Sequence, residues 1–352
     1  MHQKMGLTVR IAALLCALVA CARVVQGQVE DQLTAKARIF PEIGPGLRSL
    51  KATPDGKTYI LAAPGTLVSV FGKDSKLLKT IPDYSGSPGS AFAPASAELR
   101  VIRFGEGMDV DAQGNVYVAD RAANAVKVWS ADGTARMSSV NSPMSVAALG
   151  EGEVAVTTLN DSHLVIVFDK NGRDVREFGD PEPISDRQDL NRFLNIGELQ
   201  TDGKGHLYYA FLYMPEPTVR LYDRNGYSSG QDVQYTAVEA AAEAQAVRRE
   251  IVRQEKHQKS PTFKRVLTAV GVDPATGETW MAVGSLLLRF DKEGSRRASY
   301  KLYTPEGARL DAQTILIQPD RLIIGSDPLG VYQFDRPDKQ HTDKEHPDKD
   351  AN

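Results

Sequence analysis

The chain has 352 residues, with 42 Lys and Arg against 45 Asp and Glu, and 41% of its residues are hydrophobic, so that its formal net charge is -3. This composition is typical of a soluble globular protein and excludes a disordered chain, a collagen-like chain and a protein with several membrane spans. Because a nearly neutral chain has no general attraction for polyanions, we expect no nucleic-acid partner.

The first 22 residues are typical of a secretion signal peptide. Lys4 and Arg10 precede an apolar run over residues 11–22, which is shorter than the ~20 residues that a bilayer span requires. We therefore expect an exported protein that is periplasmic or extracellular. Both cysteines of the chain, Cys16 and Cys21, lie in this leader, so no disulfide is expected in the mature body.

The end of the leader has two interpretations. Leu18 to Cys21 resembles the lipobox of lipoproteins, in which Cys21 is acylated and anchors an otherwise soluble body to a membrane. Ordinary cleavage after Ala22, or a little later near Gln28, is the other interpretation. Under the lipoprotein interpretation, the protein contacts a membrane only through the lipid on Cys21.

An internal repeat organises residues 45–336. The clearest unit, residues 107–133, has three short strands rich in β-branched or aromatic residues, separated by Asp/Gly turns and a polar loop. The third strand of each unit ends on an aromatic residue just before a turn rich in Asp and Gly. These aromatic residues are Phe71, Trp129, Phe168, Tyr222, Phe290 and Phe334.

Residues 107–133 resemble an NHL repeat, and residues 45–336 resemble a six-bladed β-propeller of the NHL/SMP-30-like type. The expected fold is all-β, with six four-stranded antiparallel blades and one helical insertion, in a domain that spans residues 30–336. The sixth unit lacks an outer strand, since residues 337–352 form a charged tail that we expect to be disordered. Residues 35–40 are expected to supply that strand and to close the ring.

Three long insertions interrupt the repeat, at residues 82–103, 180–197 and 231–264. Each is placed between the fourth strand of one unit and the first strand of the next, so all three should emerge around one mouth of the central channel. Such loops commonly bind partners, although tolerated surface insertions are the alternative. Residues 236–259 predict a helix, with Thr236 and Glu239 as a capping box, that is either a solvated brace or a lid.

The topology also selects a polar face at this mouth, whose expected role is contact with a protein or a small polar ligand. Its members are Arg103, Glu106, Asp109, Asp120, Arg121, Asn124, Asn160, His163 and Glu198. No catalytic residue and no metal site is predicted from motifs. The string from Gly226 to Gly230 matches the G-x-S-x-G motif of hydrolases, but Gly226 is a turn glycine of the repeat, so Ser228 is not expected to be a nucleophile.

Two main hypotheses for the function follow. The first is a non-catalytic binding or protein-interaction module without a cofactor, and a structural component of the cell envelope is a variant of it. The alternative, which the resemblance implies, is a hydrolase of the SMP-30/gluconolactonase type that holds a divalent cation such as calcium on the axis. Counting along the first strands places on the axis Thr53, Asp109, Ala147, Gln200, Gly271 and Ile317. Only Asp109 among them is a carboxylate, although Glu106, Glu198, Asn160 and Asp120 are near enough in sequence to contribute.

Overall fold

The computed structural model describes residues 31–83, 99, 101–132, 134–159, 162–228, 230, 232–235, 240–257 and 262–338. One compact unit begins at Gln32. The predicted signal peptide with Cys21, the candidate residue Asn160, the capping-box pair and the tail from residue 339 onward lie outside the described residues. In the part of the chain that is described, no helix is both long and apolar enough to cross a membrane.

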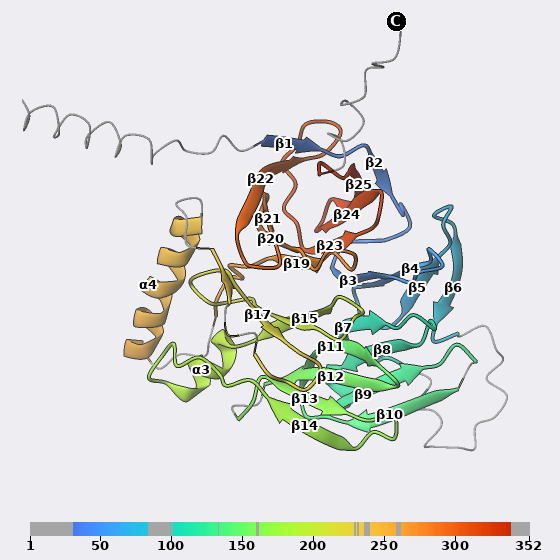
Figure 1. Ribbon diagram of the computed structural model, residues 1–352, viewed down its shortest axis with the longest axis horizontal. Helices are drawn as coiled ribbons and strands as arrows, with labels where there is room; N and C mark the ends of the chain where they lie inside the picture. The colour runs from blue at the N-terminus through green and yellow to red at the C-terminus, as the bar shows by residue number, and fades with distance from the viewer. Residues whose placement is uncertain are drawn as a thin grey trace, which may run out of the picture. The chain divides into compact units, whose positions relative to one another are not determined.

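The folded unit is a six-bladed β-propeller of antiparallel sheets, as the repeat predicts (Figure 1). Each first strand contacts the first strand of the next blade, and the first strand of the sixth blade contacts that of the first. The ring is therefore closed in chain order, with blade 1 opposite blade 4. The first strands are β3 (Leu47–Ala52), β7 (Gly105–Val110), β11 (Pro143–Gly150), β15 (Gly197–Thr201), β19 (Ala269–Val272) and β23 (Thr314–Ile317).

The remaining strands follow outward from the axis in each blade. The second strands are β4 (Thr58–Ala62), β8 (Val116–Asp120), β12 (Glu153–Thr158), β16 (Leu207–Phe211), β20 (Thr279–Val283) and β24 (Arg321–Ser326). The third strands are β5 (Val68–Phe71), β9 (Ala125–Trp129), β13 (Val165–Phe168), β17 (Thr218–Tyr222), β21 (Leu286–Phe290) and β25 (Gly330–Asp335). The fourth strands of blades 1 to 5 are β6 (Leu77–Ile81), β10 (Ala135–Ser139), β14 (Asp174–Phe178), β18 (Val233–Gln234) and β22 (Arg296–Tyr303).

The N-terminal segment closes the ring. β2 (Ala37–Ile39) pairs with β25 and is the outer strand of blade 6, which confirms the closure predicted for residues 35–40. Just before it, β1 (Asp31–Thr34) adds a fifth strand to blade 5 beside β22, which the sequence analysis did not anticipate. The two pairings cover the outer edges of β22 and β25 with short strands.

Aspartates of the turns explain why the repeat is visible in the sequence. The carboxylate oxygen Oδ1 of Asp169 accepts hydrogen bonds from the backbone N–H groups of Asn171 (2.8 Å) and Arg173 (2.9 Å), and Asp223 holds Asn225 (2.8 Å) and Tyr227 (2.9 Å) in the same way. Such side-chain acceptors satisfy the backbone of a tight turn. Gly226, with φ at +90°, occupies one of these turns, so the G-x-S-x-G string belongs to a β-turn rather than to a strand–turn–helix elbow.

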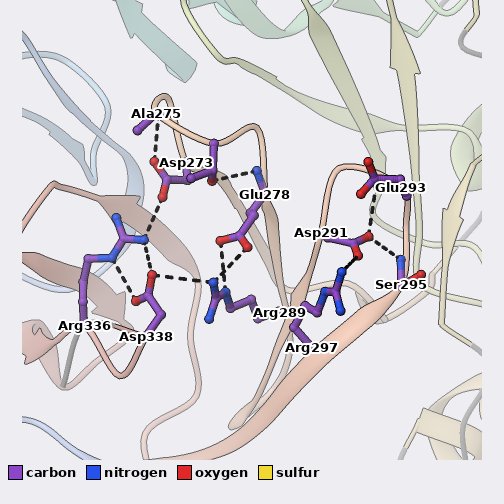
Figure 2. A network of polar contacts seen from close by, with 11 residues as sticks. Asp273, Ala275, Glu278, Arg289, Asp291, Glu293, Ser295, Arg297, Arg336 and Asp338 are labelled. Atoms are coloured by element: carbon purple, nitrogen blue, oxygen red, sulfur yellow. Dashed lines mark hydrogen bonds and ion pairs between the residues drawn. The ribbon is translucent and has the colours of Figure 1, made fainter. Parts of the chain in front are cut away.

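A network of charges joins the segment after β25 to blade 5 (Figure 2). Its members Asp273 and Glu278 lie where the first strand of blade 5 ends, whereas the residues of the mouth lie where first strands begin, so the network is at the other end of the disc. Arg336, which follows β25, contacts Asp273 at 2.7 Å and Asp338 at 2.6 Å, while Arg289 contacts Glu278 at 2.8 Å. We call these five residues the closing cluster. Because Asp338 takes part, the folded region extends beyond the predicted boundary at residue 336.

Two helices emerge from the insertions between blades and pack against each other. They are α3 (Gln188–Leu194) and α4 (Ala241–His257), which lie side by side in Figure 1. Leu190 and Leu194 of α3 contact Val247 and Ile251 of α4 in one buried cluster. The predicted helix is thus confirmed over the described residues, and α3 is an addition to it. One detail was wrong, because the third insertion begins only after β18, which lies within the predicted range 231–264.

Candidate functional site at the mouth of the channel

Three β-bulges shape the mouth of the channel. The first strands of blades 1, 2 and 3 each shift register at the same place, which sets Arg48, Glu106 and Met144 apart from the regular pairing. A bulge turns the extra side chain in a new direction and is common beside functional sites. Here all three residues line a cavity of ≈ 70 Å³, which Glu198 and Arg265 also line.

A hydrogen bond that crosses the channel starts from Lys51, which also lines this cavity. The ammonium Nζ of Lys51 in blade 1 donates to the amide oxygen of Gln200 in blade 4 at 2.7 Å, and blades 1 and 4 are opposite each other. The same ammonium lies 3.5 Å from Oδ1 of Asp109 in blade 2. The second oxygen of Asp109 accepts the backbone N–H of Ala148 in blade 3 at 2.8 Å. Side chains of two other blades therefore converge on Lys51.

A second set of charges surrounds Glu106, which lines the same cavity. Its carboxylate pairs with the guanidinium of Arg48 at 2.7 Å and lies 3.8 Å from that of Arg121. The Arg48 guanidinium also lies over the ring of Phe104, 4.2 Å from the ring centroid. This cation–π contact fixes the arginine at the mouth and leaves little freedom to Glu106.

Glu198 differs from the other channel carboxylates because it forms no ion pair with any cationic side chain in the described part of the chain. Its oxygen Oε1 accepts a hydrogen bond of 2.7 Å from the amide nitrogen of Gln200. Although the side chain borders the cavity, protein surrounds it, and this burial raises the pKa of Glu198 above its usual value of 4.5, while the charges of Lys51 and Arg265 act in the opposite direction. A carboxyl with a raised pKa in a cavity is a candidate for proton transfer.

Arg265 also lines the cavity at the mouth. It lies in the segment that returns from α4 to β19, and the neighbouring Val266 donates its backbone N–H to the carbonyl of Leu212 at 2.8 Å, which fixes the segment beside the loop between β16 and β17. The Arg265 side chain is exposed and makes no hydrogen bond or ion pair with any other described residue. Its positive charge is therefore available to a ligand.

The arrangement does not fit the divalent cation that the resemblance implies. A hard cation needs several oxygen ligands around one empty centre. Here the ammonium of Lys51 occupies the place between Asp109 and Gln200, and Arg48 occupies one side of Glu106. Across the residues that the structure describes, no three Asp, Glu, His or Cys side chains are arranged to hold a metal ion.

Of the residues predicted for the binding face, Glu106, Asp109 and Glu198 come together at the channel, and Arg121 lies beside Glu106. Asp120 lies elsewhere, fully buried, with its carboxylate 2.9 Å from the ammonium of Lys127 and accepting the backbone N–H groups of Arg103 and Phe104, both at 2.9 Å. Burial alone would raise the pKa of Asp120, but these hydrogen bonds lower it overall. Asp120 and the backbone of Arg103 therefore anchor the segment that enters β7, and this position does not let Asp120 reach a ligand.

The remaining predicted residues lie away from the cavity. Asn124 ends the short 3₁₀ helix η1 (Arg121–Ala123), and its side-chain oxygen accepts the backbone N–H of Ser142 at 3.0 Å. His163 pairs with Glu177 at 2.9 Å, and Glu177 belongs to β14, the outermost strand of blade 3. His163 is thus directed to the rim of the disc rather than to its axis.

The predicted axial row needs two corrections. In each blade, one residue of the second strand pairs with the repeat aromatic of the third strand, and the residue after it pairs with the axial residue of the first strand. By this rule the axial residues are Lys51, Asp109, Ala147, Gln200, Gly271 and Leu316. Lys51 replaces Thr53, which instead donates to Asp55 in the turn at 2.5 Å, and Leu316 replaces Ile317. A signal was present in the sequence, because Lys51, Asp109 and Gln200 each stand eight residues before a tyrosine.

A larger groove of ≈ 690 Å³ lies on the outer flank of blade 4, away from the axis. Its central Arg220 pairs with Asp232 at 3.1 Å and with Glu182. The arginine of this groove is thus already paired within the protein, whereas Arg265 at the channel mouth has no ion pair with another described residue.

No family model and no curated protein matches the chain. Solved structures do match its fold. Two of them share the overall propeller fold with this chain. A gluconolactonase from Xanthomonas campestris aligns with a TM-score of 0.53 and 15% identity, over 88% of this chain and 96% of that one. A calcium-binding regucalcin from Agrobacterium tumefaciens aligns with a TM-score of 0.52 and 12% identity, over the same shares. At such identities the likeness concerns the fold alone.

Proposed function

We propose that the protein binds the polar end of a small, oxygen-rich molecule at the mouth of its channel and hydrolyses a lactone or related ester there. The observation that carries this proposal is Glu198, a carboxyl with a raised pKa that borders a cavity and forms no ion pair with another described residue. Arg265 supports it, because an unpaired guanidinium at the same mouth favours a ligand on which negative charge develops. The cavity of ≈ 70 Å³ suits one functional group rather than a whole large ligand.

The proposed reaction is a general-base hydrolysis. The Glu198 carboxylate accepts a proton from a water molecule while the water oxygen bonds to the carbonyl carbon of the substrate. The carbonyl oxygen becomes an oxyanion, which the Arg265 guanidinium stabilises. The bond from the carbonyl carbon to the leaving oxygen then breaks, and that oxygen takes the proton back from Glu198. No step needs a metal ion.

The fold neighbours make this hypothesis preferable to a module without chemistry, because one of them is named a gluconolactonase. Our proposal departs from the cation-dependent form of the hypothesis, since the channel of this chain places Lys51 between the acidic groups. We further propose that the protein acts outside the cytoplasm, on the strength of the leader over residues 1–22.

The test is a panel of sugar lactones and aryl esters, assayed for acid release in the presence of EDTA. The wild-type protein is expected to hydrolyse at least one compound, and Glu198→Gln is expected to lower kcat by about 10²- to 10⁴-fold with little change in KM. Glu177→Gln is the matched control, because Glu177 lies on the outer strand of blade 3. Equal rates for the wild type and Glu198→Gln would refute the role of Glu198.

A second candidate is a binding module without catalysis, which the packed pair α3 and α4 favours because the helices of two insertions share one buried apolar cluster. The same panel separates the two candidates. Binding of a compound, measured by calorimetry, without any turnover across the panel would support the module and contradict the hydrolase.

A further inference from the structure

The position of Lys51 has a consequence for the metal chemistry of this channel. Its side chain is only 13% exposed and that of Asp109 only 8% exposed, so the two charges compensate each other in a place where water is scarce. A buried ammonium persists only where such partners surround it. Gln200 supplies the third group from the opposite blade, at 2.7 Å.

We propose that Lys51 is a built-in cation, which occupies the axis of this propeller in place of a divalent metal ion. The ammonium presents one positive charge to Asp109 and Gln200, whose oxygen atoms are of the kind that calcium prefers. Glu198 lies close enough for the charge of Lys51 to act on it. In the wild-type protein the place between Asp109 and Gln200 is therefore already occupied, and the charge of Asp109 is compensated, so a divalent ion finds no site there.

The register of the strands supports this assignment. Lys51, Asp109 and Gln200 are equivalent residues of their blades, each paired with a tyrosine of the second strand, Tyr59, Tyr117 and Tyr208. Their side chains leave the backbone at one level of the channel, which is why a single group on the axis can contact all of them. The contact therefore depends on how the first strands are arranged around the axis and not on the conformation of a loop.

The inference predicts that removal of the ammonium creates a calcium site. In Lys51→Met, an apolar chain of similar length replaces the lysine, and Asp109 and Gln200 are left to bind a cation from solution. We expect Lys51→Met to unfold at a lower temperature than the wild type in EDTA. Calcium should then raise its midpoint by about 5 °C at a concentration 100-fold above the dissociation constant. The wild type and Lys79→Met, a change on the exposed outer strand β6 of the same blade, should not respond.

Two further variants make the experiment decisive. Asp109→Asn in the Lys51→Met background should abolish the response to calcium, because it removes the charged ligand. Lys51→Gln keeps a donor for Gln200 and serves if Lys51→Met does not fold. The inference is wrong if a folded Lys51 variant does not bind calcium by calorimetry, or if wild-type protein binds calcium and Asp109→Asn abolishes that binding. Calcium binding is measured directly, so the result does not depend on the hydrolysis proposed above.

Discussion

The two ends of the disc carry two clusters of charge that differ in how their acids are compensated. In the closing cluster, burial alone would raise the pKa of Asp338, but the hydrogen bonds and charge of Arg336, helped by Arg289, lower it overall. At the channel mouth, burial raises the pKa of Glu198, and the opposing effects of Lys51, Arg265 and the hydrogen bond from Gln200 are too small to reverse it. The comparison indicates that the closing cluster stabilises the ring, and we propose that the mouth keeps Glu198 available for proton transfer.

The largest effect is expected from the closing cluster. Arg336→Met leaves Asp273 and Asp338 buried without their main partner, and we expect it to lower the free energy of unfolding by about 3–5 kcal/mol, measured by urea denaturation. Arg297→Met is the matched control, because Arg297 is exposed and pairs with Asp291 at 2.6 Å, a kind of pair worth about 1 kcal/mol or less. Similar losses for both variants would contradict the structural role of the closing cluster.

A smaller effect of opposite sign is expected at the mouth. Because the folded-state pKa of Glu198 lies above its unfolded value, the unfolded chain loses this proton first, so Glu198 costs stability as the pH rises above 4.5. Glu198→Gln should therefore raise the thermal midpoint at pH 8 by about 2 °C. The gain should vanish below pH 4.5, where the glutamate is protonated in both states. A variant that is less stable than the wild type at pH 8 would show that Glu198 is a structural carboxylate instead.

Much of the fold was predictable because its signals are local. The aromatic ends of the third strands and the aspartates of the turns repeat within a few residues, and they gave the number of blades and the closure by β2 correctly. The site was predictable only in part, since it depends on contacts across the ring. Arg265 reaches the mouth through a long insertion, and Arg48 is turned toward it by a bulge, neither of which leaves a clear pattern in the sequence.

Asp120 is the opposite case, a residue that was predicted at the binding face but lies buried elsewhere. At the end of a strand, before the polar loop, an aspartate is expected at the surface, and the sequence analysis placed it on the binding face. Its partner Lys127 lies seven residues later on the next strand, with a side chain that is 1% exposed and also donates to the carbonyl of Val101 at 2.7 Å. A lysine buried at that position runs against the usual preference of the residue, so only the packed structure identifies the pair.

The most direct test of the account is a titration of the two carboxyl groups, Glu198 and Asp338, by ¹³C NMR of protein labelled at its side-chain carboxyls, with Glu198→Gln and Asp338→Asn used to assign the signals. We predict that Glu198 titrates above 4.5 and that Asp338 titrates below 3.8. A Glu198 signal that titrates at or below 4.5 would contradict the assignment of the channel mouth as a site of proton transfer.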